Sequence, residues 1–218
     1  MDQFRASYTI LNTWASGDYE RTIKSYFRLE EFDNKAMADG RDWHNKWAAE
    51  VLTTNSIPKI FGDKKLKNPT VEQYMKVQLS DWLELSGKID CLDEPTIYDW
   101  KTGKQSSEAY ASDKQVGIYG VLCTMKKIYV DRGEIYHFDQ YKKQPDMSVT
   151  WITDKLLKDS LNWIETLSSE IHNYFIQNDL YKKYNYMRAT RSGEVSVETG
   201  TPAEGSVKVP AYSTPDHN

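Results

Sequence analysis

Polar and apolar residues alternate with a period of two in the middle of the chain, which predicts two neighbouring strands. The first is a half-buried strand over residues 83–91, where polar side chains alternate with Leu83, Leu85, Gly87, Ile89 and Cys91. Residues 93–96 have turn chemistry, because Pro95 presets its own backbone angle. Residues 96–102 then form the second strand, and a four-residue loop would pair Leu92 with Ile97.

This pairing brings two acidic residues and a lysine onto one face of the sheet. Asp99 and Lys101 share a face because side chains alternate along a strand, and Trp100 lies on the other face. Asp90 then lies opposite Asp99, with Cβ atoms about 5 Å apart. Two carboxylates that close repel each other unless a cation lies between them. Mg²⁺ or Mn²⁺ is the expected occupant because both prefer oxygen ligands, and Lys101 would lie beside it.

The rest of the chain predicts an α/β fold with a central mixed sheet flanked by helices. Residues 71–79 alternate as a third strand, antiparallel to the first through a turn near Ser80 and Asp81. Helical spacing is found over residues 37–51 and 154–177. A further strand is expected over 134–141, and residues 147–152 form another strand or an extended lead-in to the last helix. Residues 7–30 are helical with a break at 16–18.

Two helices bring candidate functional side chains toward the sheet. His44 lies on the apolar face of the helix over 37–51, as a metal ligand or as a hydrogen-bonded core histidine. Gln115 and Tyr119 are spaced i, i+4 on a helix and face the same way. Tyr119 could be core alone, whereas a buried Gln115 amide needs partners. Residues 181–186 stack bases or close over the core.

Four motifs in this order resemble the PD-(D/E)XK nuclease superfamily, and its RecB-type branch in particular. They are Gly-x-x-x-His over residues 40–44, Gly-x-x-Asp over 87–90, Asp-Trp-Lys over 99–101 and Gln-x-x-x-Tyr over 115–119. The resemblance implies that His44, Asp90 and Asp99 bind the metal, together with the carbonyl of Trp100. It also implies that Lys101 assists catalysis, and that Gln115 and Tyr119 line the site or the substrate path.

Length and charge constrain this interpretation. The 218 residues fit one domain over 1–190, followed by a tail over 191–218 that lacks an apolar period and is expected to be flexible. The net charge is −4, and up to residue 191 the chain holds 27 Lys and Arg against 28 Asp and Glu. Because bulk charge does not attract DNA, binding single strands or duplex ends would need a local groove and the metal.

The cysteine content argues against an iron–sulfur cluster and a disulfide framework, and the hydropathy argues against a membrane-spanning segment. Some RecB-type relatives carry an iron–sulfur cluster, which commonly needs four thiolates, but this chain has only Cys91 and Cys123. We therefore expect no iron–sulfur cluster and, without a disulfide framework, a reducing cytoplasm. No secretory signal and no stretch of membrane-spanning length are found.

These observations favour a Mg²⁺- or Mn²⁺-dependent deoxyribonuclease, acting as an exonuclease on DNA ends or single strands in repair, recombination or phage DNA metabolism. Three questions stay open. The chain could be a non-catalytic module that binds DNA ends or proteins and has kept the fold. It could be another metal-dependent phosphohydrolase, since fold does not fix function. A protein partner or a homo-oligomer is also compatible with the sequence.

Overall fold

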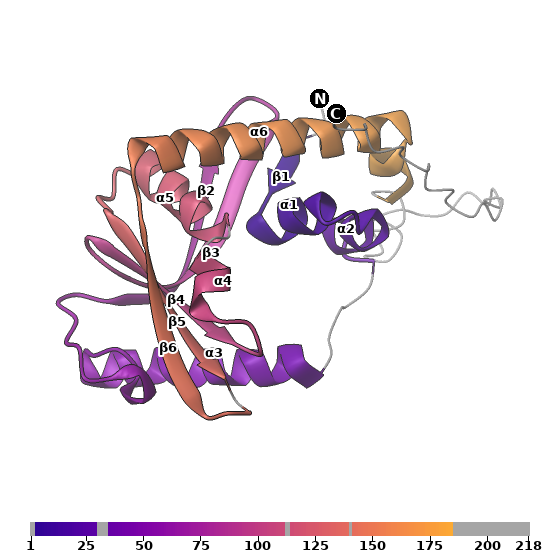
Figure 1. The fold of residues 1–218 in the computed structure, drawn as a ribbon. Helices are drawn as coiled ribbons and strands as arrows, with labels where there is room; N and C mark the ends of the chain where they lie inside the picture. Colours follow the sequence, from indigo (N-terminus) through magenta and orange to yellow (C-terminus); the bar gives the residue numbers. More distant parts are fainter. Residues whose placement is uncertain (1–2, 30–34, 112–113, 140, 185–218) are drawn as a thin grey trace, which may run out of the picture.

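The computed structural model describes residues 3–29, 35–111, 114–139 and 141–184 (Figure 1). Six strands form one mixed sheet: β1 (Phe4–Ala6), β2 (Thr70–Gln78), β3 (Leu83–Asp93), β4 (Thr96–Thr102), β5 (Arg132–Asp139) and β6 (Gln144–Trp151). The helices are α1 (Tyr8–Ala15), α2 (Tyr19–Tyr26), α3 (Lys35–Thr54), the short 3₁₀ helix η1 (Lys59–Phe61), α4 (Ser107–Ala111), α5 (Gln115–Met125) and α6 (Asp154–Gln177). The predicted α/β class is therefore confirmed.

The three predicted antiparallel strands form β2, β3 and β4 in chain order. Leu92 pairs with Ile97, which confirms the predicted register. Asp93 also pairs with Thr96, so the loop is two residues shorter than we expected. Beyond them, β4 pairs with β5 in parallel, and β6 closes the sheet antiparallel to β5. Parallel pairing requires a crossover, and α4 and α5 lie within the segment that connects β4 to β5.

One edge of β3 is left open in the middle. Residues 83–85 of β3 pair with β1, and residues 91–93 pair with β4. Both partners lie on the edge of β3 opposite β2, because β2 pairs with the same β3 residues from the other side. Within the described residues, no strand pairs with positions 86–90 on that edge. Backbone groups there need other partners, and side chains supply them at the site described below.

Helices cover both faces of the sheet and enclose two cores (Figure 1). α5 and α6 lie on one face, over a core that includes Leu85, Ile89 and Ile118. α3 and η1 lie on the other face, over a mainly aromatic core that includes Trp47 and Trp100. Apolar side chains on alternating positions of the strands thus build a separate core on each side.

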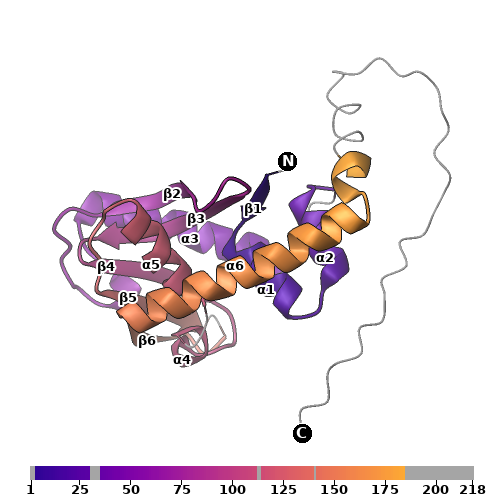
Figure 2. The same cartoon turned by 90° about the horizontal axis from the view of Figure 1, so that it is seen from above.

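The two ends of the described chain pack together along α6 (Figure 2). The break at Gly17 is confirmed, because this residue has a φ of 83° and separates α1 from α2. The strand β1 was not predicted, since three residues are too short to show a period. Tyr181 and Tyr184 are buried in the core beside α2 and close over it, as one of the two interpretations predicted. The predicted tail over 191–218 lies outside the described residues.

Candidate metal centre

Asp90 fills the open edge of β3, where β3 and β4 diverge. The paired positions end at Cys91 and Tyr98, so Asp90 and Asp99 are the next residues along the two strands. Asp90 is only 5% exposed, and its Oδ2 accepts a hydrogen bond of 2.8 Å from the backbone N–H of Trp100. A carboxylate therefore satisfies a backbone donor that strand pairing leaves free.

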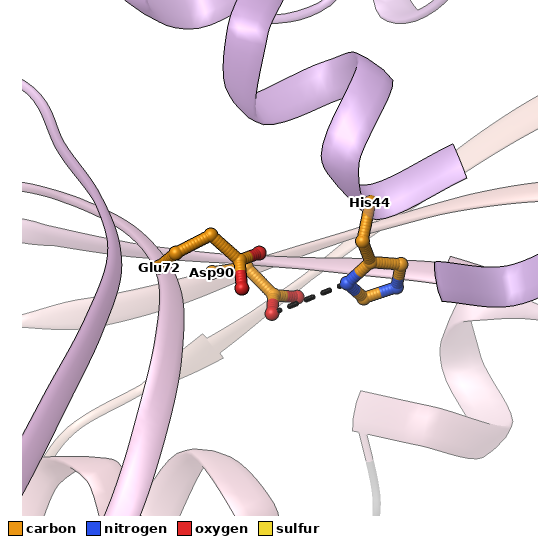
Figure 3. A group of neighbouring side chains, drawn as sticks. All are labelled: His44, Glu72 and Asp90. Atoms are coloured by element: carbon orange, nitrogen blue, oxygen red, sulfur yellow. Dashed lines mark ion pairs between the residues drawn. The ribbon is translucent and has the colours of Figure 1, made fainter. Parts of the chain in front are cut away.

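Helix α3 brings His44 to this carboxylate. A Cβ on Gly40 would lie 3.4 Å from Thr102 Oγ1, so the helix runs close to the end of β4 at this point. His44 Nδ1 lies 3.3 Å from Asp90 Oδ1 (Figure 3). Burial lowers the pKa of His44, but the hydrogen bond and negative charge of Asp90 outweigh burial and leave that pKa raised. The structure thus places His44 beside Asp90, and its role as a metal ligand stays a prediction.

Glu72 is a third potential metal ligand beside His44 and Asp90. The sequence motifs did not indicate it. Ligand atoms of His44, Glu72 and Asp90 all lie within 4.8 Å of one another, and Figure 3 shows the two carboxylates side by side. Glu72 lies opposite Asp90, because the flanking pairs join Val71 to Cys91 and Gln73 to Ile89. The turn predicted near Ser80 and Asp81 did not define this register, so the position of Glu72 follows from the observed pairing.

The strand β2 is distorted at Glu72. This residue has a φ of 52°, which is unusual for a residue with a side chain, and it makes no paired contact in the ladder. In a regular strand Val71 and Met75 would point to the same face. Here Val71 packs in the aromatic core and Met75 in the core on the opposite face, so the alternation is interrupted between them. Backbone strain of this kind costs about 1–3 kcal/mol and is concentrated at functional sites.

A chain of hydrogen bonds leads from Asp99 into helix α5. Lys101 Nζ lies 2.7 Å from Asp99 Oδ2 and donates to Gln115 Oε1 at 2.9 Å. Gln115 Nε2 donates to the Tyr119 hydroxyl at 2.7 Å, and that hydroxyl donates to the backbone carbonyl of Lys88 at 2.7 Å. Since Lys88 lies on the open edge of β3, Tyr119 supplies a partner that no neighbouring strand supplies.

The charges at the site shift one another's pKa values. Burial raises the pKa of Asp99 to about 6, an effect that Lys101 opposes and Asp90 reinforces. For Asp90, burial acts in the same direction, but the hydrogen bond and charge of His44 and the charge of Lys101 outweigh it and lower the pKa. Burial would lower the pKa of Lys101, yet the two carboxylates raise it. The lysine therefore stays cationic, and its charge stabilises both aspartates.

The residues at the site fit a divalent cation. Asp99 Oδ1 and Glu72 Oε1 are buried, and neither has a hydrogen-bond partner among the described residues. A buried carboxylate oxygen without a donor is costly, and a cation removes that cost. Carboxylate oxygens with one imidazole suit a small, hard ion such as Mg²⁺ or Mn²⁺.

The fold brings the predicted site residues into one region. One contact joins His44 to Asp90, and a chain of contacts joins Asp99, Lys101, Gln115 and Tyr119. The hydrogen bond from the backbone N–H of Trp100 to Asp90 brings the two groups together. The Trp100 side chain lies in the aromatic core beside Phe61, and its backbone N–H reaches the site. The assignment of Asp99 and of the Trp100 carbonyl as ligands stays a prediction, because the group of three ligands contains Glu72 instead of either.

A hollow of about 440 Å³ opens from the site to solvent. Its lining includes Gly40, His44, Glu72, Lys88 and Thr102. Lys88 forms an ion pair with Glu72 there. The carboxylates are therefore accessible from this side, next to a lysine.

Three comparisons place the chain among known proteins. A family model described as the PD-(D/E)XK nuclease superfamily matches residues 5–187. Among proteins of curated function, none matches the chain in sequence. The crystal structure of the alkaline exonuclease LHK-Exo from Laribacter hongkongensis is similar in fold, with 11% identity and a TM-score of 0.48, over 88% of this chain and 95% of that chain. The structure of LHK-Exo in complex with dAMP gives 12% identity and a TM-score of 0.48, over 87% and 94%.

Two further predictions concern cysteines and membranes. Cys91 and Cys123 are buried in different cores, and burial raises the pKa of each thiol to about 12. The expected absence of an iron–sulfur cluster stays a prediction. In the described part of the chain, no helix combines the length and the apolar character needed to cross a membrane.

Proposed function

This chain belongs to the PD-(D/E)XK nuclease superfamily, and we propose that it is a Mg²⁺- or Mn²⁺-dependent nuclease that hydrolyses phosphodiester bonds in DNA. The observation that carries the proposal is the group formed by His44, Glu72 and Asp90, together with Asp99, whose pKa the charge of Asp90 raises and whose carboxylate lies 2.7 Å from the half-buried ammonium of Lys101. Acidic residues this close need a cation, and a cation beside a lysine suits the hydrolysis of a phosphodiester.

The metal would be held by Asp90, His44 and Glu72, with Asp99 and the Trp100 carbonyl as the further ligands that the motif implies. When bound, it supplies a water of lowered pKa and polarises the phosphate. His44 presents Nδ1 toward Asp90, and this nitrogen would bind a cation through its lone pair in place of the hydrogen bond to the carboxylate. The carbonyl of Trp100 is carried by the same peptide segment whose N–H fixes Asp90.

We propose that Lys101 stabilises the negative charge that develops on the phosphate during hydrolysis. Asp99 and Gln115 hold its ammonium in place, and the carboxylates keep it protonated. A fixed cation of this kind orients the attacking water or neutralises the phosphoryl oxygens without having to reorganise during the reaction.

Gln115 and Tyr119 are proposed as positioning residues for Lys101. The Tyr119 hydroxyl must donate to the Lys88 carbonyl, because a carbonyl only accepts. It therefore accepts from Gln115 Nε2, and this orients Gln115 Oε1 toward Lys101. The direction of these hydrogen bonds determines the orientation of the Gln115 amide, and the amide in turn holds Lys101 in position.

The finer assignments rest on the sequence motifs. The RecB-type strings over residues 40–44 and 115–119 support an exonuclease that acts on DNA ends or single strands. A role in DNA repair, recombination or phage DNA metabolism and a reducing, cytoplasmic location are proposed on the same basis, together with the unpaired cysteines.

The test is digestion of end-labelled linear DNA and covalently closed circular DNA by the purified chain. We expect cleavage with Mg²⁺ or Mn²⁺ and none with a chelator, and we expect linear DNA alone to be degraded if the chain acts on ends. Asp99→Asn should abolish cleavage. The matched control is Asp159→Asn, because Asp159 pairs with Lys155 on the exposed side of α6, away from the site.

Either of two results would overturn the proposal. The parent chain could leave all DNA intact while binding its ends, which would identify a non-catalytic binding module. Alternatively, Asp99→Asn could cut as fast as Asp159→Asn, and the reacting site would then lie elsewhere.

A further inference from the structure

The strands β2 and β3 continue beyond the metal centre as a polar surface. Three cross-strand pairs follow Glu72 and Asp90 along the ladder: Tyr74 with Lys88, Lys76 with Ser86, and Gln78 with Glu84. Paired residues share a face, and residues two apart along a strand do too. Met75 and Val77 point the other way, into the core under α5 and α6. These six residues therefore form one face, named here the β2–β3 track.

Two hollows adjoin each other along this track. The hollow at the metal centre is lined by Glu72 and Lys88. A second hollow, of about 580 Å³, is lined by Tyr74 and Ser86 and extends to β1 and the end of α2. From Asp90 to Glu84 the strand covers about 20 Å, at roughly 3.3 Å per residue. That length accommodates several nucleotides of an extended strand.

The second hollow carries an excess of positive charge. Its acidic residue, Glu84, lies between two cations, at 3.9 Å from Arg5 and 3.6 Å from Lys76. Arg28 lies on the rim and forms no ion pair within the described residues. Although the protein as a whole is slightly acidic, this hollow has cations left over for phosphate groups.

Tyr74 lines the second hollow, pairs with Lys88 of the first hollow and is exposed to solvent. Its exposed fraction is 64%, and no ring contact or hydrogen bond of its side chain is found among the described residues. An aromatic ring that is exposed between flanking cations offers a stacking surface for a base, and stacking of this kind tolerates any sequence.

We propose that the β2–β3 track binds a single strand of nucleic acid that leads into the metal centre, with a base stacked on Tyr74 and phosphates held by Lys76, Arg5 and Arg28. This inference rests on the proposed nuclease function and adds the form of its substrate. A single strand is favoured over a duplex because only an unpaired base can present its face to the Tyr74 ring.

Binding can be tested apart from cleavage by working in a chelator. The probe is a fluorescein-labelled oligothymidylate of about 12 nucleotides, titrated by fluorescence anisotropy against the full chain. We expect Tyr74→Ala to weaken binding about tenfold and Tyr74→Phe to retain it, because the phenyl ring still stacks. The matched control is Tyr129→Ala, since Tyr129 is exposed to a similar extent, 69%, and lies outside both hollows.

The salt dependence of binding separates stacking from phosphate contacts. Lys76→Gln should lower the slope of log K against log salt concentration by about 0.7, the value for one phosphate contact on a single strand. Tyr74→Ala should weaken binding without changing that slope. Lys155→Gln is the control for charge, because Lys155 also pairs with a carboxylate but lies on α6. The melting temperature of each variant should match the parent, since these side chains lie at the surface.

The outcomes distinguish this inference from the proposed function. If the parent binds and cuts single strands while Tyr74→Ala and Lys76→Gln keep its affinity and salt slope, the track is wrong and the nuclease stands. If the oligonucleotide binds through Tyr74 but the parent cuts no DNA with Mg²⁺ or Mn²⁺, the track stands and the nuclease function is wrong. A duplex of equal length that binds as tightly, and is weakened equally by Tyr74→Ala, would overturn the preference for a single strand.

Discussion

Lys101 owes its properties to its neighbours. A buried lysine ordinarily loses its proton more readily, but two aspartates raise the pKa of this ammonium. Gln115 and Asp99 also restrict its position through bonds of 2.9 Å and 2.7 Å. The charge and the placement of Lys101 are thus set by residues from β3, β4 and α5.

Replacing this lysine should separate metal binding from cleavage. In Lys101→Met a cation next to the carboxylates is removed, so metal affinity should persist or increase. Cleavage should fall by about a hundredfold or more, the scale of losing one electrostatic contact in the transition state. Asp99→Asn should instead lower both quantities. Calorimetric titration with Mn²⁺, beside a single-turnover digest, measures the two effects, and normal cleavage by Lys101→Met would show that the site is misassigned.

Glu72 provides a second test at the residue scale. Its Oε1 is buried and has no partner within the described chain, and the side chain lies against Asp90. If it is a ligand, Glu72→Gln should weaken Mn²⁺ binding about tenfold, which is about 1.4 kcal/mol. Glu84→Gln is the matched control on the same sheet face. Equal Mn²⁺ affinity in the two variants would leave Glu72 as no more than a partner of Lys88.

Among the elements, the segment between η1 and β2 is attached to β5 by charge. Lys64 lies 2.7 Å from Glu134 Oε1, and Arg132 lies 3.1 Å from the same oxygen. Burial raises the pKa of Glu134, but the bonds from Lys64 and Arg132 outweigh it and lower that pKa. Lys64, in the loop over residues 63–69, is therefore engaged by the sheet.

This attachment should make stability sensitive to acid. A carboxylate whose pKa is lowered by folding stabilises the native state above its unfolded pKa, and the stabilisation is lost as pH falls through the lowered value. Glu134→Gln should therefore lower the free energy of unfolding at pH 7 by about 1–3 kcal/mol and flatten its decline in acid. Urea unfolding from pH 3 to pH 7 measures this, with the exposed Glu165→Gln as control. An unchanged acid decline would show that Glu134 contributes nothing to it.

In the whole molecule, α6 joins the N-terminal helices to the nuclease core. Its first half packs on α5, where a Cβ on Gly117 would lie 2.0 Å from Ser160 Oγ. Its second half packs on the N-terminal segment, where Trp14 Nε1 donates to Glu170 at 2.9 Å. Beyond the helix, the Tyr181 hydroxyl lies 2.6 Å from His172 Nδ1.

Two truncations test where the folded unit ends. A chain ending at Thr190 should melt cooperatively at the temperature of the parent, because the tail has no apolar period. A chain ending at Asp179 loses the buried side chains of Leu180, Tyr181 and Tyr184, and should be destabilised by roughly 3 kcal/mol or more. Calorimetric melting measures both. Equal losses in the two truncations would place part of the folded unit in the tail.

The sequence alone determined what local periodicity controls. The turn predicted at residues 93–96 led to the pairing of Leu92 with Ile97, and alternation along 96–102 to the shared face of Asp99 and Lys101. Helical spacing correctly predicted α6, and the turn chemistry at Gly17 correctly predicted the break between α1 and α2. These features depend on residues close together in the chain, so a pattern within one stretch is enough to predict them.

The tertiary structure alone decided how distant segments complete the site. No period marks β1, whose pairing leaves an open edge on β3 beside Asp90. The contact between Gln115 and Lys101 depends on how α5 lies on the sheet. In the sequence, Glu72 looks like an ordinary polar residue of a strand. It becomes a candidate ligand because its backbone has a φ of 52° and because the neighbouring strand brings Asp90 next to it. These outcomes depend on packing between segments far apart in sequence, which no local pattern encodes.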